Sequence, residues 1–190
     1  SKLLEMTRLE SAGFRLEKEW YPLDELVGAA LSRLGRILKQ HQVVTEIPED
    51  LPLLHVDGRL IEESLGNLLE NAARYTPPGT IITIRARAND SAVTVEVVDN
   101  GPGLQSGMEK EIFRRFVRSR PAGDRQGTGL GLAIFDAVMR LHDGVVGAES
   151  VQPHGARFWF TLPMQAGHPG DGAALNKQAG AEFASGVNRE

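Results

Sequence analysis

The chain has 190 residues, a formal net charge of −4, 41% hydrophobic residues and no cysteine. At about 100 to 200 residues per domain, this length predicts one main domain with appendages. The missing cysteines exclude disulfide scaffolds, zinc ribbons, iron–sulfur clusters and cysteine nucleophiles. The acidic balance disfavours a nucleic-acid partner. No apolar run reaches the roughly 18 to 20 residues that span a bilayer, and the start lacks a signal-peptide core, so we expect a soluble chain.

Helical periodicity predicts three main helices. Residues 1–13 indicate only the end of a helix, because their apolar positions stop at a glycine. Apolar spacing then predicts an amphipathic helix over 23–38. Asp57 is the expected N-cap of a second helix, which the prolines after Thr76 end. A short helix is expected around 109–116, and a third main helix over about 130–141.

Alternating apolar residues predict the strands. Short strands are expected at 14–16 and 43–47. A hairpin is expected over 80–88 and 92–98, and a closing pair over 145–149 and 157–162. Hairpins interrupted by helices favour an α+β fold, a two-layer sandwich, over a doubly wound parallel sheet. Residues 164–190 have few large apolar side chains, which predicts a flexible tail.

Common motifs of nucleotide and hydrolase sites are missing. There is no G-x-x-x-x-G-K-[ST], H-E-x-x-H or G-x-S-x-G sequence. The stretch 127–132 is G-x-G-x-G, but Leu132 stands where a dinucleotide fingerprint needs a small residue. Any ligand site must therefore use other patterns.

The second helix carries polar residues at helical spacing. Asn67, Asn71 and Arg74 lie on one edge of it, opposite the apolar face. Asparagine is a poor residue for a helix interior, so this pair indicates a ligand edge. Carboxamide oxygens suit Mg²⁺, which is usually shared with substrate phosphates. The alternative is a polar stripe that faces solvent.

Two glycine patterns offer bare backbone. Asp99 and the glycines 101 and 103 follow a predicted strand, where a carboxylate beside exposed backbone suits a flat ligand. An ordinary turn is the alternative there. The glycines 127, 129 and 131 open the third helix, whose free N–H groups and dipole favour an anion. The alternative for these is a mobile loop.

A basic stretch lies between the two glycine patterns. It is long enough for a lid over a site, and its arginines suit charge-assisted contacts to phosphate. A solvated basic loop is the alternative. Its members are Phe113, Arg114, Arg115, Phe116, Arg118, Arg120 and Arg125.

Together, these patterns resemble the N, G1, F and G2 boxes of the ATP-binding domain of sensor histidine kinases, within the gyrase, heat-shock-90, histidine-kinase and MutL ATPase group. The matching stretches are N-L-L-E-N-A-A-R-Y-T, D-N-G-P-G-L, I-F-R-R-F and G-T-G-L-G-L-A-I, with 155–158 as a last glycine element. The resemblance spans about 14–163. Within the family, four stretches resemble the potassium-responsive KdpD sensors, namely 3–13, E-K-E-W at 17–20, H-V-D-G at 55–58 and 65–75.

The resemblance implies a mixed sheet of about five strands with helices on one face, and ATP held between the second helix and the lid. Asp99 would bind the adenine amino group, Gly103 would let backbone approach the ring and Tyr75 would stack near the base. Asn71 would ligate Mg²⁺, Asn67 would support that site through water and Arg74 would reach the phosphates. The implied nucleotide-binding residues are Asn67, Asn71, Arg74, Tyr75, Asp99, Gly101, Gly103, Arg118, Gly127, Thr128, Gly129, Leu130 and Gly131.

The resemblance also implies transfer of the γ-phosphate to a histidine on a dimerisation domain, and relay to a response regulator. No histidine of this chain lies in a motif like H-[DE]-x-R-x-P, so the acceptor is expected elsewhere. Residues 1–13 would end the second dimerisation helix, and 14–163 would form the catalytic domain. The full-length protein would be a homodimer at the inner membrane, with this part cytoplasmic and by itself monomeric.

A further departure, besides the missing acceptor histidine, limits the reaction that the resemblance implies. Asn67 stands where related ATPases carry an acidic general base, so efficient activation of water is not expected. Two other functions remain alternatives: a binding module whose lid is ordered by ATP, and a serine kinase of the anti-sigma type.

Overall fold

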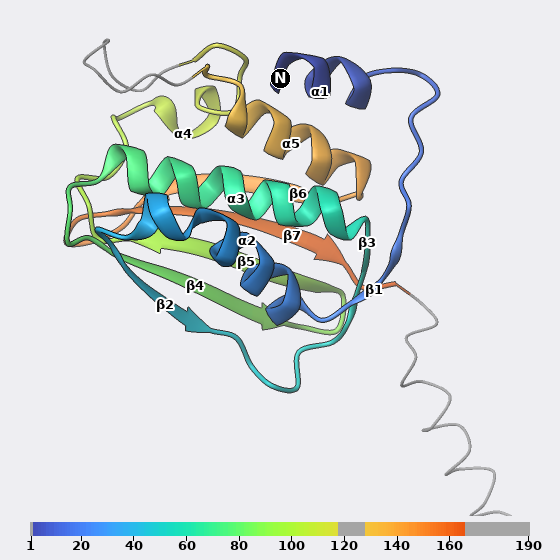
Figure 1. Cartoon of the computed structure of the whole chain (residues 1–190), viewed down its shortest axis with the longest axis horizontal. Coiled ribbons are helices and arrows are strands. Elements are labelled where there is room, and N and C mark those ends of the chain that lie inside the picture. Colours follow the sequence, from blue (N-terminus) through green and yellow to red (C-terminus); the bar gives the residue numbers. More distant parts are fainter. Residues whose placement is uncertain (1, 118–127, 166–190) are drawn as a thin grey trace, which may run out of the picture.

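The computed structural model describes residues 2–117 and 128–165. Its centre is a five-stranded sheet in the order β2, β4, β5, β7, β6. β2 pairs with β4 in parallel, and the other pairs are antiparallel. The mixed five-stranded sheet is thus confirmed (Figure 1). The bounds of its strands are β2 Gln42–Glu46, β4 Ile81–Ala88, β5 Ala92–Asp99, β7 Ala156–Pro163 and β6 Val145–Ser150.

The main helices cover one face of this sheet. α3 (Gly58–Tyr75) lies between α2 (Leu23–Leu38) and α5 (Gly131–Leu141) and contacts both (Figure 1). α1 (Lys2–Leu9) packs on α5, and the one-turn helix α4 (Met108–Glu111) lies against β6. The predicted two-layer arrangement is therefore confirmed, and each main helix lies within a few residues of its expected place.

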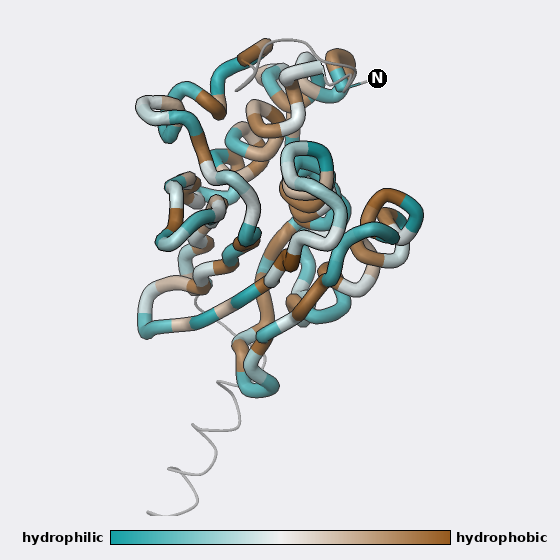
Figure 2. Tube along the Cα trace, turned by 90° about the vertical axis from the view of Figure 1, so that its left-hand side faces the viewer, coloured by the Kyte–Doolittle hydropathy of each residue, from teal (hydrophilic) through white to brown (hydrophobic). Residues whose placement is uncertain are grey.

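The core fills the space between the two layers. Hydrophobic residues recur among hydrophilic ones along both helices and strands (Figure 2). Phe135 of α5 and Phe160 of β7 are fully buried, with their rings edge to face at 5.8 Å between centroids. Burying a side chain of this size stabilises the fold by about 1.5–3 kcal/mol. Other fully buried side chains are Leu60, Ile61, Leu65, Leu68, Leu69, Ile82, Ile84, Ile134 and Met139.

A second sheet has only two short strands, β1 (Glu19–Tyr21) and β3 (Leu54–Val56), which pair antiparallel. The strand predicted at 14–16 is wrong, because the chain there forms neither helix nor strand. β3 was not predicted. A three-residue strand is too short to show alternation, and its partner lies far away in sequence. The short helix expected at 109–116 ends at Glu111, and turns follow.

Asp57 caps α3 as predicted and also joins three segments. Its Oδ1 accepts from the Leu60 N–H at 3.3 Å, and its Oδ2 accepts from the Glu17 N–H at 3.2 Å. Its own N–H donates to Nε2 of His142 at 3.0 Å, while Nδ1 of that ring lies 2.8 Å from the Val138 carbonyl. Burial lowers the pKa of the His142 imidazole, so a neutral ring holds the start of α3 against the end of α5.

None of the helices in the described ranges is long and apolar enough to cross a lipid bilayer. The predicted tail beyond 165, and most of the expected lid, lie outside the described residues. So do the predicted site residues Arg118 and Gly127.

Candidate nucleotide-binding site

A first pocket lies where the end of α3 meets the end of β5. Most of its lining is apolar, with one buried carboxylate among it, a combination that suits a flat ring carrying a hydrogen-bond donor. We call it the base pocket. It is lined by Asn71, Ala72, Tyr75, Thr76, Asp99, Pro102, Gly103, Leu104, Gln105, Ile112, Ala156 and Phe158.

Asp99 is the charged group of the base pocket and is only 6% exposed. Its Oδ1 accepts from the N–H groups of Gly101 at 2.9 Å and Ala156 at 3.3 Å. Burial raises the pKa of this carboxyl, and the two backbone hydrogen bonds act in the opposite direction. Within the described residues no hydrogen bond is made to Oδ2, so this oxygen remains an acceptor for a ligand.

Glycines bring the backbone close around Asp99. A Cβ at Gly101 would lie 2.6 Å from Cγ2 of Thr76, and one at Gly155 would lie 2.0 Å from the Asp99 carbonyl oxygen. Gly103 has a φ of +81°, and a Cβ there would lie 2.9 Å from the Gly155 carbonyl oxygen. These glycines are therefore needed for packing within the protein. The role of Gly103 towards a ligand stays a prediction.

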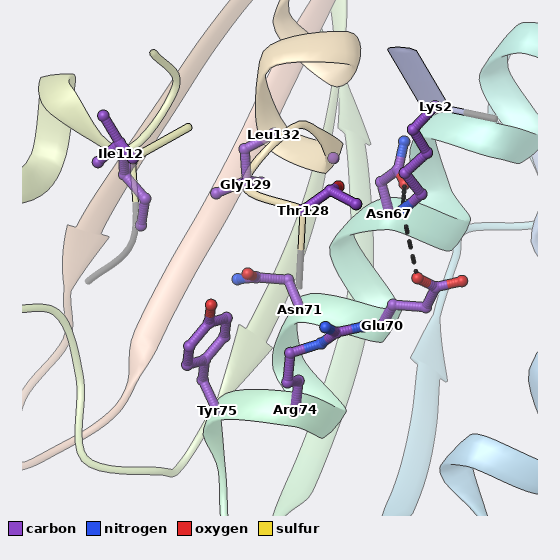
Figure 3. Close-up of a pocket in the computed structure, with 12 residues that line it drawn as sticks. Lys2, Asn67, Glu70, Asn71, Arg74, Tyr75, Ile112, Thr128, Gly129 and Leu132 are labelled. Carbon is purple, nitrogen blue, oxygen red and sulfur yellow. Dashed lines mark hydrogen bonds and ion pairs between the residues drawn. The ribbon is translucent and has the colours of Figure 1, made fainter. Parts of the chain in front are cut away.

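A second pocket lies between the edge of α3 and the start of α5 (Figure 3). It shares Asn71, Tyr75 and Ile112 with the base pocket, so the two adjoin. We call it the phosphate pocket, because α5 begins there without a side-chain cap and its first N–H groups favour an anion. It is lined by Lys2, Asn67, Glu70, Asn71, Arg74, Tyr75, Ile112, Val117, Thr128, Gly129, Gly131 and Leu132.

Asn67 lines the phosphate pocket and is only 6% exposed. Its Oδ1 accepts from Nζ of Lys2 at 2.9 Å, and its Nδ2 is buried without a partner among the described residues. A buried amide without a partner costs about 1–3 kcal/mol, which a water or a phosphate oxygen would recover. The alternative of a solvent-facing stripe is therefore wrong for Asn67.

The structure brings together most of the predicted site residues. Figure 3 shows most of these residues around one space. The phosphate pocket is lined by Asn67, Asn71, Arg74, Tyr75, Thr128, Gly129 and Gly131. Asp99 and Gly103 line the base pocket. Gly101 and Leu130 are buried next to these two pockets.

Sequence reasoning missed several lining residues, namely Lys2, Glu70, Thr76, Leu104, Ile112 and Ala156. All of these except Lys2 lie inside the stretches that resemble the family's boxes, so their position in sequence was an available signal. Lys2 gave none, since it is 65 residues away from its partner Asn67.

The donors present fit a hard cation only in combination with a ligand. Within 2–117 and 128–165, no three His, Asp or Glu side chains gather in a way that could hold a metal ion. The phosphate pocket instead offers the amide oxygens of Asn67 and Asn71 and the carboxylate of Glu70. Mg²⁺ usually takes one or two protein ligands and completes its shell with water and phosphate oxygens. The set is therefore compatible with a Mg²⁺–nucleotide complex.

Two of the five arginines in the basic stretch do not line the phosphate pocket. Arg114 pairs with Glu111 at 2.7 Å, and Arg115 pairs with Glu10. Both face a separate cavity between α4, α5 and the edge strand β6, where Trp159 also lies. The expected phosphate contacts are therefore wrong for these two. The other three lie outside the described residues.

The comparison with protein families decides what kind of domain carries these pockets. Residues 56–166, more than half of the chain, match the family of histidine kinase-, DNA gyrase B- and HSP90-like ATPases. The chain belongs to this family. The ATPase-type fold and the resemblance given above are thereby confirmed.

The relatives and solved structures that the chain resembles include sensor proteins and sensor histidine kinases. The sensor protein KdpD of Escherichia coli strain K12 is 43% identical over 165 residues, which cover 87% of this chain. The same stretch is 18% of that protein's length, so the chain spans about a fifth of this relative. Among solved structures, full-length ShkA in complex with AMPPNP matches with a TM-score of 0.77 at 26% identity, over 88% of this chain and 35% of that one. The mycobacterial sensor histidine kinase MprB matches with a TM-score of 0.68 at 27% identity, over 77% of this chain and 97% of that one.

Proposed function

We propose that this chain is the catalytic domain of a two-component sensor histidine kinase of the potassium-responsive KdpD type, and that it binds Mg·ATP across the two pockets. One observation carries the proposal. The buried carboxylate of Asp99 lies in one of two adjoining pockets, and the start of α5 with Asn67 and Arg74 lines the other. A base, a sugar and a chain of phosphates have this order.

Recognition of the base depends on the free oxygen of Asp99. The adenine amino group donates to Oδ2, while Gly101 and Ala156 hold Oδ1 in place. Because the carboxylate is desolvated, a donor from the ligand restores a hydrogen bond that burial has removed. A hydrogen bond to a charged group contributes about 1.5–3 kcal/mol. Tyr75 lines both pockets and covers the base edge near the ribose.

The phosphates lie against the start of α5 and beside Arg74. Bound Mg²⁺ supplies neutralisation of charge on the phosphates; Asn71 would hold it directly and Asn67 through water. This chain's residues therefore bind and orient the triphosphate with fixed donors, which is most of what phosphoryl transfer asks of a protein.

The reaction is transfer of the γ-phosphoryl group to an imidazole nitrogen, with ADP as the leaving group. The acceptor histidine belongs to a dimerisation domain of the same kinase. In this proposal α1 is the last part of the second helix of that domain. A response regulator then receives the phosphoryl group. The side chain of Asn67 is a neutral amide and cannot act as a general base towards water. This favours phosphoryl transfer to the histidine over hydrolysis of ATP. The full protein is a homodimer at the inner membrane, with this domain on the cytoplasmic side.

Equilibrium titration with a fluorescent ATP analogue tests the binding step. Asp99→Asn should weaken binding about 10- to 100-fold, the equivalent of one hydrogen bond to a charged group. Asp136→Asn is the matched control, because burial also raises the pKa of Asp136 and that residue lines the separate cavity near α5. Equal affinity of wild type and Asp99→Asn would overturn the assignment of the base pocket.

Phosphotransfer is tested by adding a dimerisation domain that contains its histidine, with ATP labelled at the γ position. The proposal predicts an acid-labile phosphohistidine on the added domain. Binding without transfer would instead support the lid-switching module, and phosphoserine on a partner would support the serine kinase.

A further inference from the structure

Lys2 places a positive charge inside the phosphate pocket. Its Nζ donates to Oδ1 of Asn67 at 2.9 Å and lies 3.4 Å from Oε2 of Glu70 (Figure 3). Lys2 belongs to α1, whereas both acceptors belong to α3. The ammonium group thus reaches the site from a helix outside the matched family region, which begins at residue 56.

The acceptors of Lys2 are the oxygen donors that suit a hydrated Mg²⁺ in this pocket. Within the described residues, the pocket has no His, Asp or Glu cluster that could hold a metal in another place. An ammonium group and a divalent cation repel each other strongly at a few ångströms in a partly buried site. Both cannot use Asn67 and Glu70 at the same time.

α1 packs only weakly on the rest of the domain, so it can detach. Only one face is buried, through Met6 and Leu9, whereas Leu3 and Leu4 are 56% and 71% exposed. Its contact with α3 also brings two carboxyl groups near each other, because burial and then the neighbouring Glu63 raise the pKa of Glu5. Oε1 of Glu5 is buried without a partner in the described part of the chain. An unpaired buried oxygen weakens the contact.

We propose that Lys2 is a tethered cation that occupies the metal end of the phosphate pocket, so that seating of α1 and binding of Mg·nucleotide compete. The proposal rests on the proposed function. Binding of Mg·ATP then displaces Lys2 and loosens α1, and a seated α1 weakens Mg·ATP binding by the same factor. A nucleotide without metal does not compete in this way, because its phosphates attract the ammonium group.

The test compares nucleotide affinity with and without Mg²⁺, using a fluorescent ADP analogue and the whole chain. Lys2→Met should bind the Mg·ADP analogue about tenfold more tightly than wild type, the equivalent of one charge-assisted contact. In EDTA it should bind no more tightly than wild type. Arg8→Met is the matched control, since it removes a positive charge from the same helix at a residue that lies over the Phe14 ring, outside the pocket. This control should leave both affinities unchanged.

Weaker binding of Lys2→Met with and without Mg²⁺ would make Lys2 an ordinary phosphate ligand and would overturn the proposal. Unchanged affinities in both conditions would overturn it as well. If neither wild type nor Lys2→Met binds nucleotide, the proposed function itself has failed.

A second readout follows α1 directly. The chain has no cysteine, so Leu4→Cys gives a single labelling site on the exposed face of α1. Fluorescence anisotropy of the label should fall on addition of Mg·ADP, because α1 is released, and should not fall with ADP in EDTA. An equal response in the two conditions would contradict competition at the metal end.

Discussion

The base pocket and the phosphate pocket differ in how they are built. The base pocket is made of β5, β7 and the end of α3, which hydrogen bonds and close glycine contacts fix around Asp99. The phosphate pocket is assembled from α3, the start of α5 and Lys2 of a weakly seated helix. One end of the site is thus part of the folded core, and the other depends on segments that can move independently. We therefore expect substitutions of the glycines around the base pocket to lower the stability of the fold, and substitutions at the phosphate pocket to change mainly binding.

The largest effect is expected at Gly155. Its φ is +130°, and a Cβ there would lie 2.0 Å from the Asp99 carbonyl oxygen, so Gly155→Ala forces β7 away from β5. We expect a loss of about 2–4 kcal/mol in the free energy of unfolding, measured in urea. The control is Gly28→Ala in α2, where a Cβ meets nothing within 4 Å and should stabilise the helix by about 0.5–1 kcal/mol. Equal effects of the two variants would remove the claim that the base pocket is part of the core.

Asp99→Asn should separate binding from stability. The folded-state pKa of Asp99 is raised by burial, so its ionisation costs stability above the unfolded pKa, and this cost disappears as pH falls. The variant should therefore lose nucleotide affinity while its apo form is at least as stable as wild type at pH 7.5. The stability difference should shrink towards pH 4. Urea unfolding at several pH values measures it, and a strongly destabilised variant at pH 7.5 would contradict the prediction.

His142 tests the joint that holds the two helices of the site. Burial lowers the pKa of His142 in the folded state below its ordinary value of 6.5. At a pH below about 6.5 the unfolded chain therefore binds more protons than the folded chain. Stability should fall as pH drops below about 6.5 and should level off above it. His142→Phe leaves the Asp57 N–H without an acceptor and should cost about 1–3 kcal/mol at pH 8, with a flatter profile below pH 6.5. If His142→Phe had the same pH dependence of stability as wild type, other groups would be responsible for the loss of stability in acid.

The smallest effect is expected at Glu5. Burial, then the neighbouring Glu63, raises the pKa of Glu5 from 4.5 to about 7, against opposing contributions of Arg59 and Lys2. Seating of α1 should therefore be strongest below pH 4.5 and weaken as pH rises through 7. Anisotropy of a label at position 4 should fall between pH 6 and pH 8 in wild type. Glu5→Gln should remove this dependence, and an equal change in both proteins would disprove the role of Glu5.

Much of the fold was predictable because its signals are local. The apolar spacing of α2 and α3, the cap at Asp57 and the hairpin of β4 and β5 all appear within short stretches of sequence. The pair β1 and β3 escaped prediction because each strand is three residues long and gains its order from a distant partner.

The sequence predicted which residues form the candidate site better than it predicted the contacts that hold them in place. Asn67, Asn71 and Asp99 were found from spacing and residue type, and the structure places them in adjoining pockets. The packing of Gly103 against Gly155, and the contact of Lys2 with Asn67, join segments far apart in sequence. No local pattern encodes such contacts, since tertiary packing alone creates them.

The most direct test of the two-pocket site is an amide NMR titration of the isotope-labelled chain. Gly101 and Ala156 report on the base pocket, while Gly129 and Gly131 report on the phosphate pocket. With Mg·ATP, both pairs of amide signals should shift along one binding curve, whereas adenosine should shift only the first pair. Signals of the two pockets that follow different curves with Mg·ATP, or that do not shift, would contradict a single nucleotide bound across both.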